Sequence, residues 1–400
     1  MSETNQPRLL SFTLDGWSVL GGPVTISLND GVAVLVGRNG AGKSAILEGL
    51  MAITSFASGR NRLRPFFDDD NIPKILEIEI LSPTSRRFLY RYELLRQINL
   101  EDDLSLNSSI EDGTAEEFSW NECCQYLDQN KETIWKTESG VTTIENEDNP
   151  ITVILGNTSS LQRANLPENL SLKLPSEMHW VRSVLRGFSL IGKRPTRRSS
   201  QRYPSYLRVR SSDIRVIPIS AGELSSWLPM LIHRLIEKED FDELESVCQR
   251  VGIGKKITEQ QFVRTDKDKE YLLEVLLDEV NIGLLSDGTL RVLSILLEII
   301  TSSSTEMIII EEPETQIHPG MLEKLLNEIE SYTYGQNLIL STHSPQVVSW
   351  TKPDKINLVY RENGRTFVQK LGEDEIHNVA NYLNEEGSLG DWIYSGILDD

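Results

Sequence analysis

The stretch "GVAVLVGRNGAGKSAILEGLMAI", residues 31–53, decides the fold class of this chain. It begins with a β-branched run over Val32–Val36, continues with the pattern G-x-x-x-x-G-K-S, and ends in apolar residues at helical spacing. Its glycines let the backbone curl so that successive N–H groups point at phosphate oxygens, and the helix adds its positive N-terminal end. This strand, loop and helix together predict a nucleotide-binding site.

Two side chains of this loop have expected roles toward a bound nucleotide. Lys43 would reach the β- and γ-phosphates, and the hydroxyl of Ser44 would bind Mg²⁺. The residues expected to contact the nucleotide are Gly37, Asn39, Gly40, Gly42, Lys43 and Ser44.

A second apolar run, "MIIIEEPETQIHP" at residues 307–319, ends in two glutamates. In a parallel sheet, ligand chemistry collects at the carboxyl ends of the strands, so these carboxylates should lie beside the phosphates. Glu311 would hold Mg²⁺, and Glu312 would accept a proton from the attacking water. Taken alone, such a pair is often only solvated, and its place in the chain after the phosphate loop favours catalysis.

A third apolar run, "NLILSTHSP" at residues 337–345, repeats this design with a histidine after the strand. His343 would donate a hydrogen bond to the γ-phosphate and help to orient the water. A lone histidine after a strand is more often structural, and here the neighbouring motifs favour catalysis. His318, by contrast, is expected to brace its loop.

The stretch "LLSDGTLRVLS", residues 284–294, is a turn that leads into an apolar helix. Ser286 and the N–H of Gly288 lie at the start of a helix expected over Thr289–Thr301. They therefore form another positive helix terminus, which suits a γ-phosphate. A plain Ser/Asp helix cap accounts for the same residues, so spacing alone leaves both interpretations open.

The motifs in this order resemble the ABC-type ATPases, and within them the soluble RecF-, SMC- and OLD-like branch. The resemblance is carried by "LSDGT" (285–289), "EEPE" (311–314) and "THSP" (342–345). It implies an α/β fold, namely a P-loop NTPase of ABC-ATPase head type. Such a head has a mixed central sheet, an antiparallel β subdomain and an inserted helical subdomain.

The resemblance also implies ATP and Mg²⁺ as cofactors and a shared active site. Ser286 and Gly288 of one subunit would close over the ATP held by the other, which requires a homodimer or a higher even oligomer. Two family features have no clear counterpart. The glutamine loop has three candidates (Gln97, Gln162 and Gln201). Trp17 is near enough to the N-terminal strand to be considered as the adenine-stacking aromatic, but it is more readily interpreted as a buried or edge residue.

The chain divides into five expected regions. Residues 1–100 carry the phosphate loop and 276–372 carry the signature turn, the acidic strand end and the histidine. Between them we expect an insertion over 101–215, acidic and then basic, and a helical subdomain over 216–275. The tail, 373–400, would pack on the core or contact a partner. Period-two alternation in "ILEIEI" and "RRFLYRYELL" predicts antiparallel strands in the first lobe.

The charge of the chain limits its contact with nucleic acid. The formal net charge is −20, so DNA or RNA would have to bind through a local basic patch. Residues 182–215 offer one, with ten Arg or Lys against one acid. This basic run is open to three interpretations: a nucleic-acid contact, docking of an acidic partner, or a solvated loop.

No apolar run reaches the roughly 18 residues that span a bilayer, and the N-terminus lacks the features of a signal peptide. Three cysteines without disulfide or metal-ligand spacing are expected to be reduced thiols. These features predict a cytoplasmic protein that does not contact a membrane.

The expected function is ATP hydrolysis that serves a separate effector protein, such as a nuclease or toxin, in bacterial anti-phage defence. The stretch after His343 is too short for the TOPRIM nuclease of OLD-type relatives, so the chain is expected to act as a sensor or regulatory scaffold. The alternative is a RecF/SMC-like ATPase that clamps DNA in repair or chromosome maintenance. The Ser-Asp-Gly-Thr signature disfavours a transporter subunit.

Overall fold

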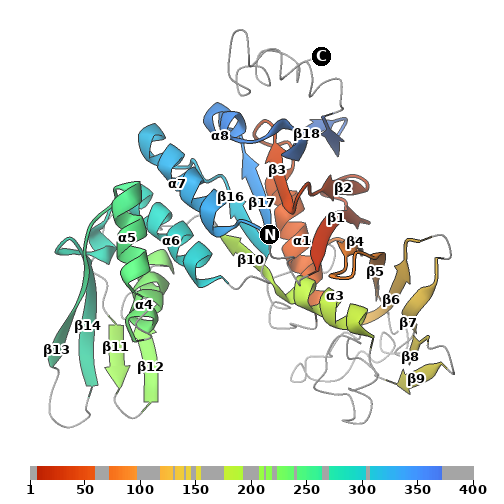
Figure 1. Ribbon diagram of the computed structural model, residues 1–400, viewed down its shortest axis with the longest axis horizontal. Coiled ribbons are helices and arrows are strands. Elements are labelled where there is room, and N and C mark those ends of the chain that lie inside the picture. The colour runs from red at the N-terminus through yellow and green to blue at the C-terminus, as the bar shows by residue number, and fades with distance from the viewer. Residues whose placement is uncertain are drawn as a thin grey trace, which may run out of the picture.

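In this computed structural model, the described residues form three β-sheets with helices between them (Figure 1). The structure describes residues 7–58, 72–96, 118–128, 131–138, 141–145, 150–154, 175–191, 207–210, 213–218, 223–237, 241–263, 270–302 and 307–371. Several sequence predictions lie outside these ranges, namely the three candidate loop glutamines, most of the basic run and the tail.

A six-stranded central sheet holds the predicted motifs. Its order is β10 (Phe188–Ile191), β16 (Met307–Glu311), β17 (Asn337–Thr342), β3 (Val32–Val36), β18 (Ile356–Glu362) and β19 (Arg365–Lys370). All neighbours are parallel except the final hairpin of β18 and β19. The apolar residues of β3, β16 and β17 are nearly all buried, as expected for parallel strands that are covered on both faces. The three strands predicted from the motifs are confirmed.

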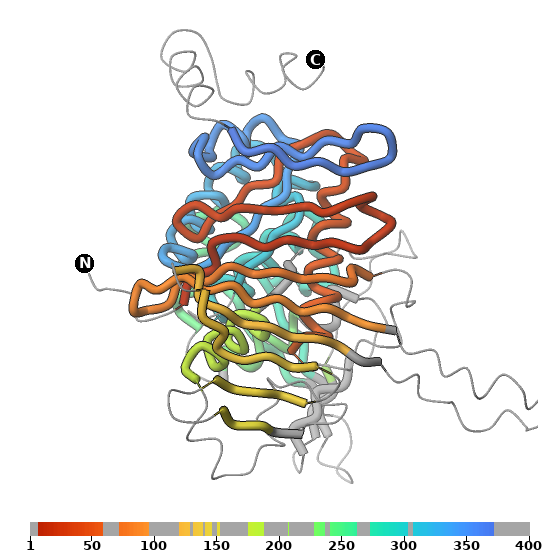
Figure 2. The backbone as a smooth tube through the Cα atoms, turned by 90° about the vertical axis from the view of Figure 1, so that its right-hand side faces the viewer, coloured from red at the N-terminus to blue at the C-terminus, as the bar shows by residue number. Residues whose placement is uncertain are grey.

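An eight-stranded antiparallel sheet lies beside the central sheet, and its strands form the successive rungs in Figure 2. Its order is β2 (Val24–Ser27), β1 (Arg8–Asp15), β4 (Ile75–Leu81), β5 (Arg87–Arg96), β6 (Phe118–Tyr126), β7 (Thr133–Glu138), β8 (Val141–Ile144) and β9 (Ile151–Ile154). Strands β4 and β5 confirm the two strands that alternation predicted. Their ion pairs, such as Arg91 with Glu77, lie partly exposed on the face away from the core.

The sequence did not reveal that this sheet continues into residues 101–170, where strands β6–β9 extend it. For β6, Glu122 explains the difference, because it is 1% exposed and occupies an inward position between Trp120 and Cys124. A charged residue at an inward position interrupts the apolar alternation by which a strand is recognised.

A third sheet lies with two helices in and around residues 216–275, where a helical subdomain was expected. The sheet order is β12 (Asp213–Pro218), β11 (Leu207–Arg210), β14 (Glu270–Leu277) and β13 (Ile257–Val263), and β15 (Val280–Asn281) also pairs with β14. The helices are α4 (Glu223–Glu237) and α5 (Asp242–Val251). The expectation was therefore incomplete, because the polar run "TEQQ" in β13 hides an edge strand that pairs with β14.

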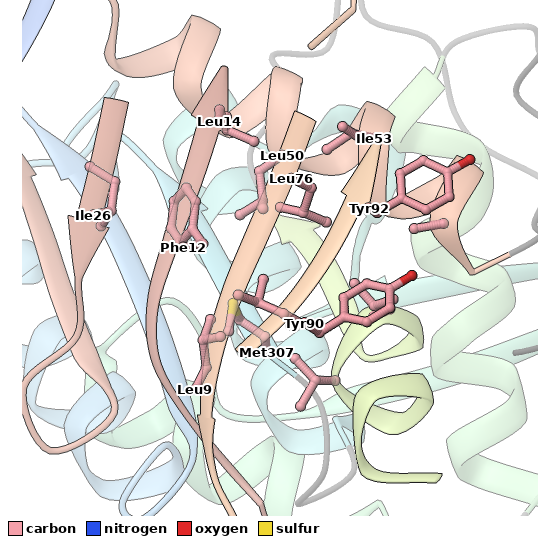
Figure 3. Close-up of a cluster of buried hydrophobic side chains, with 14 of the residues drawn as sticks. Leu9, Phe12, Leu14, Ile26, Leu50, Ile53, Leu76, Tyr90, Tyr92 and Met307 are labelled. Carbon is pink, nitrogen blue, oxygen red and sulfur yellow. The ribbon is translucent and has the colours of Figure 1, made fainter. Parts of the chain in front are cut away.

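Two hydrophobic cores cover the two faces of the central sheet. Alternate residues of β3 divide between them, with Ala33 and Leu35 in one core and Val34 and Val36 in the other. The first core, shown in Figure 3, joins the central sheet to the antiparallel sheet through α1 (Lys43–Ala57) and α3 (Ser176–Arg186).

The second core packs against the remaining helices. These are α4, α5, α6 (Asp287–Thr301), α7 (Pro319–Tyr332) and α8 (Pro345–Trp350), with short 3₁₀ turns at Ile282–Leu284 and Pro353–Lys355. Among the described residues, no helix is long and apolar enough to cross a membrane. The fold class expected from the sequence is confirmed: a P-loop α/β core with a large antiparallel sheet.

The composition of the first core predicts which substitutions lower the free energy of unfolding. Leu50 on α1 is fully buried in this core (Figure 3), so Leu50→Ala should lower the free energy of unfolding by about 2–5 kcal/mol through lost burial and a residual cavity. Leu95→Ala is the matched control, because Leu95 is 37% exposed, and it should change the value by no more than about 0.5 kcal/mol. Denaturant unfolding of both variants measures this, and equal losses would contradict the assignment of the core.

Candidate nucleotide site

The phosphate loop between β3 and α1 is tightly confined by the β18–β19 hairpin. A side chain at Gly37 would clash with the carbonyl oxygen of Val359, and one at Gly42 would clash with the side chain of Thr366. Gly42 has φ 109° and Gly40 has φ 82°, in the region that favours glycine. Open space surrounds Gly40, where a side chain would meet no described atom within 4 Å. Glycine is therefore needed at positions 37 and 42 because the hairpin packs closely against them, and at positions 40 and 42 because φ is positive there.

Lys43 is held inside this loop. Lys43 is only 5% exposed. Its Nζ donates to the carbonyl oxygens of Gly37 at 2.7 Å and Arg38 at 3.1 Å. Burial lowers the pKa of Lys43, while the negative charges of Glu312, Glu314 and Glu311 act in the opposite direction. The ammonium group thus lies within the electrostatic field of three carboxylates from the next motif.

Strand register brings the three predicted motifs to one edge of the central sheet. Ser341 of β17 pairs with Glu311 of β16 on one side and with Leu35 of β3 on the other. Just past this point, the backbone N–H of Glu312 donates to the carbonyl oxygen of Ser341 at 2.8 Å. The acidic strand end, the histidine segment and the phosphate loop are therefore neighbours.

Glu312 adopts a backbone conformation that is rare for a residue with a side chain. Its φ is 45°, and such left-handed residues cost of the order of 1–3 kcal/mol, a strain that clusters at functional sites. Its Oε2 accepts from the hydroxyl of Thr315 at 3.1 Å, and its Oε1 lies 3.4 Å from Nδ1 of His343. The two side chains chosen from the sequence as catalytic thus face each other.

Glu314, the last residue of "EEPE", has no role predicted from the sequence. Its Oε1 accepts from the hydroxyl of Thr342 at 2.7 Å and from the backbone N–H of His343 at 3.1 Å. The same oxygen lies 3.4 Å from Nδ1 of His343, and the Glu314 side chain is 10% exposed. The presence of a third carboxylate in the four-residue motif "EEPE" was a signal that could have identified Glu314 as a site residue.

The signature turn lies at the surface. Ser286 is exposed, and its Oγ accepts from the backbone N–H of Thr289 at 3.0 Å and shares a 2.7 Å hydrogen bond with the Thr289 hydroxyl. Ser286 is therefore the N-cap of α6, which begins two residues earlier than the predicted helix. Gly288 packs against the carbonyl oxygen of Gln316, which a side chain at position 288 would strike.

Arg291, the last residue of the "SDGTLR" pattern, is a second residue whose role the sequence analysis missed. It is 6% exposed within the apolar helix α6, and its guanidinium donates to the backbone carbonyl oxygens of Glu311 and Glu312. A basic residue inside an otherwise apolar helix face is a usable signal, because a buried charge needs hydrogen-bond partners. The signature helix is thus joined to the acidic turn of its own chain.

Two further expectations concern side chains outside this cluster. Trp17 is 8% exposed and packs against Gly49 of α1, so it is a buried residue, as the sequence favoured, and no surface for stacking a base. His318 accepts from the backbone N–H of Gly320 at 3.2 Å and caps α7, which agrees with the expected bracing role.

The residues at the site are suited to Mg²⁺ that is coordinated in part by the phosphate oxygens of a nucleotide. Among the described residues, no group of three or more His, Cys, Asp or Glu side chains could hold a metal ion. Mg²⁺ usually binds one or two protein groups and completes its coordination with phosphate oxygens and water. Ser44 is exposed in the first turn of α1, and Glu311 ends β16 at the same sheet edge, so both can supply such ligands.

Solved structures of SMC heads resemble this chain in fold at low sequence identity. "Crystal structure of the SmcHead bound to the C-winged helix domain of ScpA" has 12% identity and a TM-score of 0.42, covering 92% of this chain and 99% of that one. An Smc head from Pyrococcus furiosus with an extended coiled coil, bound to the C-terminal domain of ScpA, has 11% identity and a TM-score of 0.41, covering 95% and 100%. The SMC head domain from Thermotoga maritima has 12% identity and a TM-score of 0.39, covering 91% and 99%.

A comparison with curated proteins finds no match. A family model described as "AAA domain, putative AbiEii toxin, Type IV TA system" matches residues 32–349. This span contains the phosphate loop, the signature turn, the acidic strand end and the histidine segment, and it covers most of the chain. The chain therefore belongs to this AAA-domain family of P-loop ATPases.

Proposed function

We propose that the chain hydrolyses ATP at a site that two copies of the chain complete together. The observation that carries this proposal is the meeting of Lys43, Glu312 and His343 at one sheet edge. These residues supply a cation for phosphates, an acceptor for a proton and a hydrogen-bond donor, which are the groups that phosphoryl transfer to water requires.

Each side chain has a distinct part in the proposed reaction. Lys43 leaves the loop carbonyls and binds the β- and γ-phosphates, together with the backbone N–H groups of residues 37–44. Ser44 and Glu311 would hold Mg²⁺, which would neutralise charge on the phosphates. Glu312 orients the attacking water and accepts its proton, and His343 donates a hydrogen bond to the γ-phosphate.

The exposed signature turn supports a role in the second subunit's site. Ser286 is at the surface and its side-chain hydrogen bonds stay within its own helix turn, so this helix terminus is accessible to a partner. A second copy would present the same turn to the first, giving a symmetric dimer with two ATP sites. Hydrolysis then removes the γ-phosphate that both subunits contact and releases the dimer.

Blocking hydrolysis while preserving binding should trap this dimer. Glu312→Gln keeps the shape of the side chain and removes its ability to take a proton, so ATP with Mg²⁺ should shift the variant to a stable dimer on size-exclusion chromatography. The double variant Lys43→Ala/Glu312→Gln should stay at the position seen without ATP. An unchanged elution volume for Glu312→Gln at saturating ATP would contradict the dimer scheme.

Mixing two inactive variants tests whether the site is shared. Lys43→Ala damages the phosphate loop and Ser286→Arg blocks the signature turn, so each should be inactive alone. In an equal mixture about half of the dimers contain both variants and one of their two sites is intact, so about a quarter of the wild-type rate should return. The ATPase rate of the mixture measures this. No recovery, with both variants folded, would indicate a site within one chain.

For the biological role, we propose that the ATP-dependent dimer regulates a separate effector protein in anti-phage defence. The family description supports this assignment, because it refers to a toxin of a toxin–antitoxin system. Defence proteins of this kind limit the growth of their own cell, and a nucleotide-dependent dimer provides the control that such a step needs. The candidate effector is a nuclease or toxin that binds the ATP-bound dimer.

Growth measurements test this role directly. Expression of the chain with the proteins encoded beside it should protect a bacterial culture against phage, and Lys43→Ala and Glu312→Gln should abolish protection, because binding and hydrolysis are both needed. Glu323→Gln, which changes an exposed residue of α7, is the matched control and should protect like the wild type. Equal protection by the Lys43→Ala variant would contradict an ATP-dependent role.

A further inference from the structure

We infer that Glu314 is a positioning residue for hydrolysis: its buried carboxylate holds the Thr342–His343 segment so that the imidazole lies beside Glu312. This inference rests on the proposed function. It adds a third carboxylate, which neither contacts the phosphates nor takes the proton, to the two that the strand end provides.

The contacts of Glu314 are directed at the histidine segment from across the sheet edge. One oxygen, Oε1, accepts from the Thr342 hydroxyl at 2.7 Å and from the His343 backbone N–H at 3.1 Å, although 28 and 29 residues separate the partners. Hydrogen bonds to a carboxylate are stronger than those between neutral groups, and two on one oxygen fix both position and direction. The end of β17 is thereby attached to the turn that follows β16.

The backbone around Glu314 is rigid enough to act as an anchor. The Thr315 N–H donates to the carbonyl oxygen of Glu312 at 3.0 Å, and the Ile317 N–H donates to that of Glu314 at 3.1 Å. Pro313 is buried and its ring fixes φ, and Gln316 adopts a left-handed φ of 65°. Consecutive turns therefore set the direction in which the Glu314 side chain leaves the backbone.

The contacts of Glu314 place the imidazole of His343 beside two carboxylates. Nδ1 of His343 lies 3.4 Å from Oε1 of Glu312 and 3.4 Å from Oε1 of Glu314. A ring whose Nδ1 faces two carboxylates directs Nε2 away from them. In the proposed reaction, Nε2 is the atom that faces the γ-phosphate.

The two hydrogen bonds of Glu314 require an acceptor oxygen at this position, and they do not require its charge. Burying a carboxylate is costly, and a neutral acceptor could satisfy both the Thr342 hydroxyl and the His343 N–H. Oε2 of Glu314 is buried and has no hydrogen-bond partner within the described part of the chain. The position of Oε1 is therefore the property on which both contacts to the histidine segment depend.

Two substitutions distinguish the effect of the length of the Glu314 side chain from the effect of its charge. Glu314→Gln keeps the length and an acceptor oxygen, so kcat for ATP hydrolysis should stay within about threefold of the wild type. Glu314→Asp keeps the charge and withdraws the oxygen from both donors, so kcat should fall about 10- to 100-fold through misplacement of His343. The affinity for a fluorescent ATP analogue should be the same in both variants, because neither touches the phosphate loop. Glu323→Asp on the exposed face of α7 is the matched control.

A lower kcat for Glu314→Gln than for Glu314→Asp would overturn the inference, because the charge of the side chain and not its length would then be the essential property. So would a Glu314→Asp variant with wild-type kcat, or one whose ATP affinity and kcat fall together. A wild-type protein that binds ATP without hydrolysing it would instead refute the proposed function.

A second measurement tests Glu314 without any activity. With ¹⁵N-labelled histidine only five backbone signals appear, and the signal of His343 is identified by its loss in His343→Gln. Glu314→Asp should move this signal, because the carboxylate that accepts its N–H withdraws, and Glu323→Asp should leave it in place. An unmoved His343 signal in Glu314→Asp would overturn the inference even if hydrolysis were never observed.

Discussion

The parallel register of β3, β17 and β16 is the constraint on which the rest of the site depends. Each strand is an apolar run buried from both sides, so its hydrogen bonds and side-chain packing fix it relative to its neighbours. A slip of one residue would move every side chain to the opposite core. Because the register is held in this way, Gly37, Glu312 and His343 emerge at the same edge of the sheet, where side-chain contacts then set their final positions.

The electrostatic arrangement at this edge follows from that register. Lys43 is buried, its Nζ is held by carbonyl oxygens of its own loop, and the negative charges of three nearby glutamates favour its charged form. A buried cation and nearby carboxylates stabilise each other, whereas either alone would be costly. The β18–β19 hairpin supports the loop from behind through Thr366, whose hydroxyl donates to the carbonyl oxygen of Ala41 at 3.2 Å. The hairpin therefore helps to shape the loop.

The features that the sequence predicted well are those with local signals. The phosphate loop, its flanking strand and helix, and the two apolar runs that end in polar residues each carry their pattern within a short window. The features that it missed depend on distant partners. Strand β6 was hidden by the buried Glu122, strand β13 by its polar edge, and the contacts of Glu314 join residues 28 positions apart. No local period reports such pairings, because they exist only once the sheets have formed.

The Glu311–Gln316 turn connects parts of the molecule that the sequence presents as separate motifs. Arg291 of the signature helix donates to the carbonyl oxygens of Glu311 and Glu312, and Gly288 packs against the carbonyl oxygen of Gln316. The same turn holds the histidine segment through Glu314. A displacement of α6 therefore strains the carbonyl groups on either side of Glu312, whose backbone is already in a left-handed conformation. Since buried hydrogen bonds are costly to break, we expect the signature turn and the Glu311–Gln316 turn of one chain to keep their relative positions.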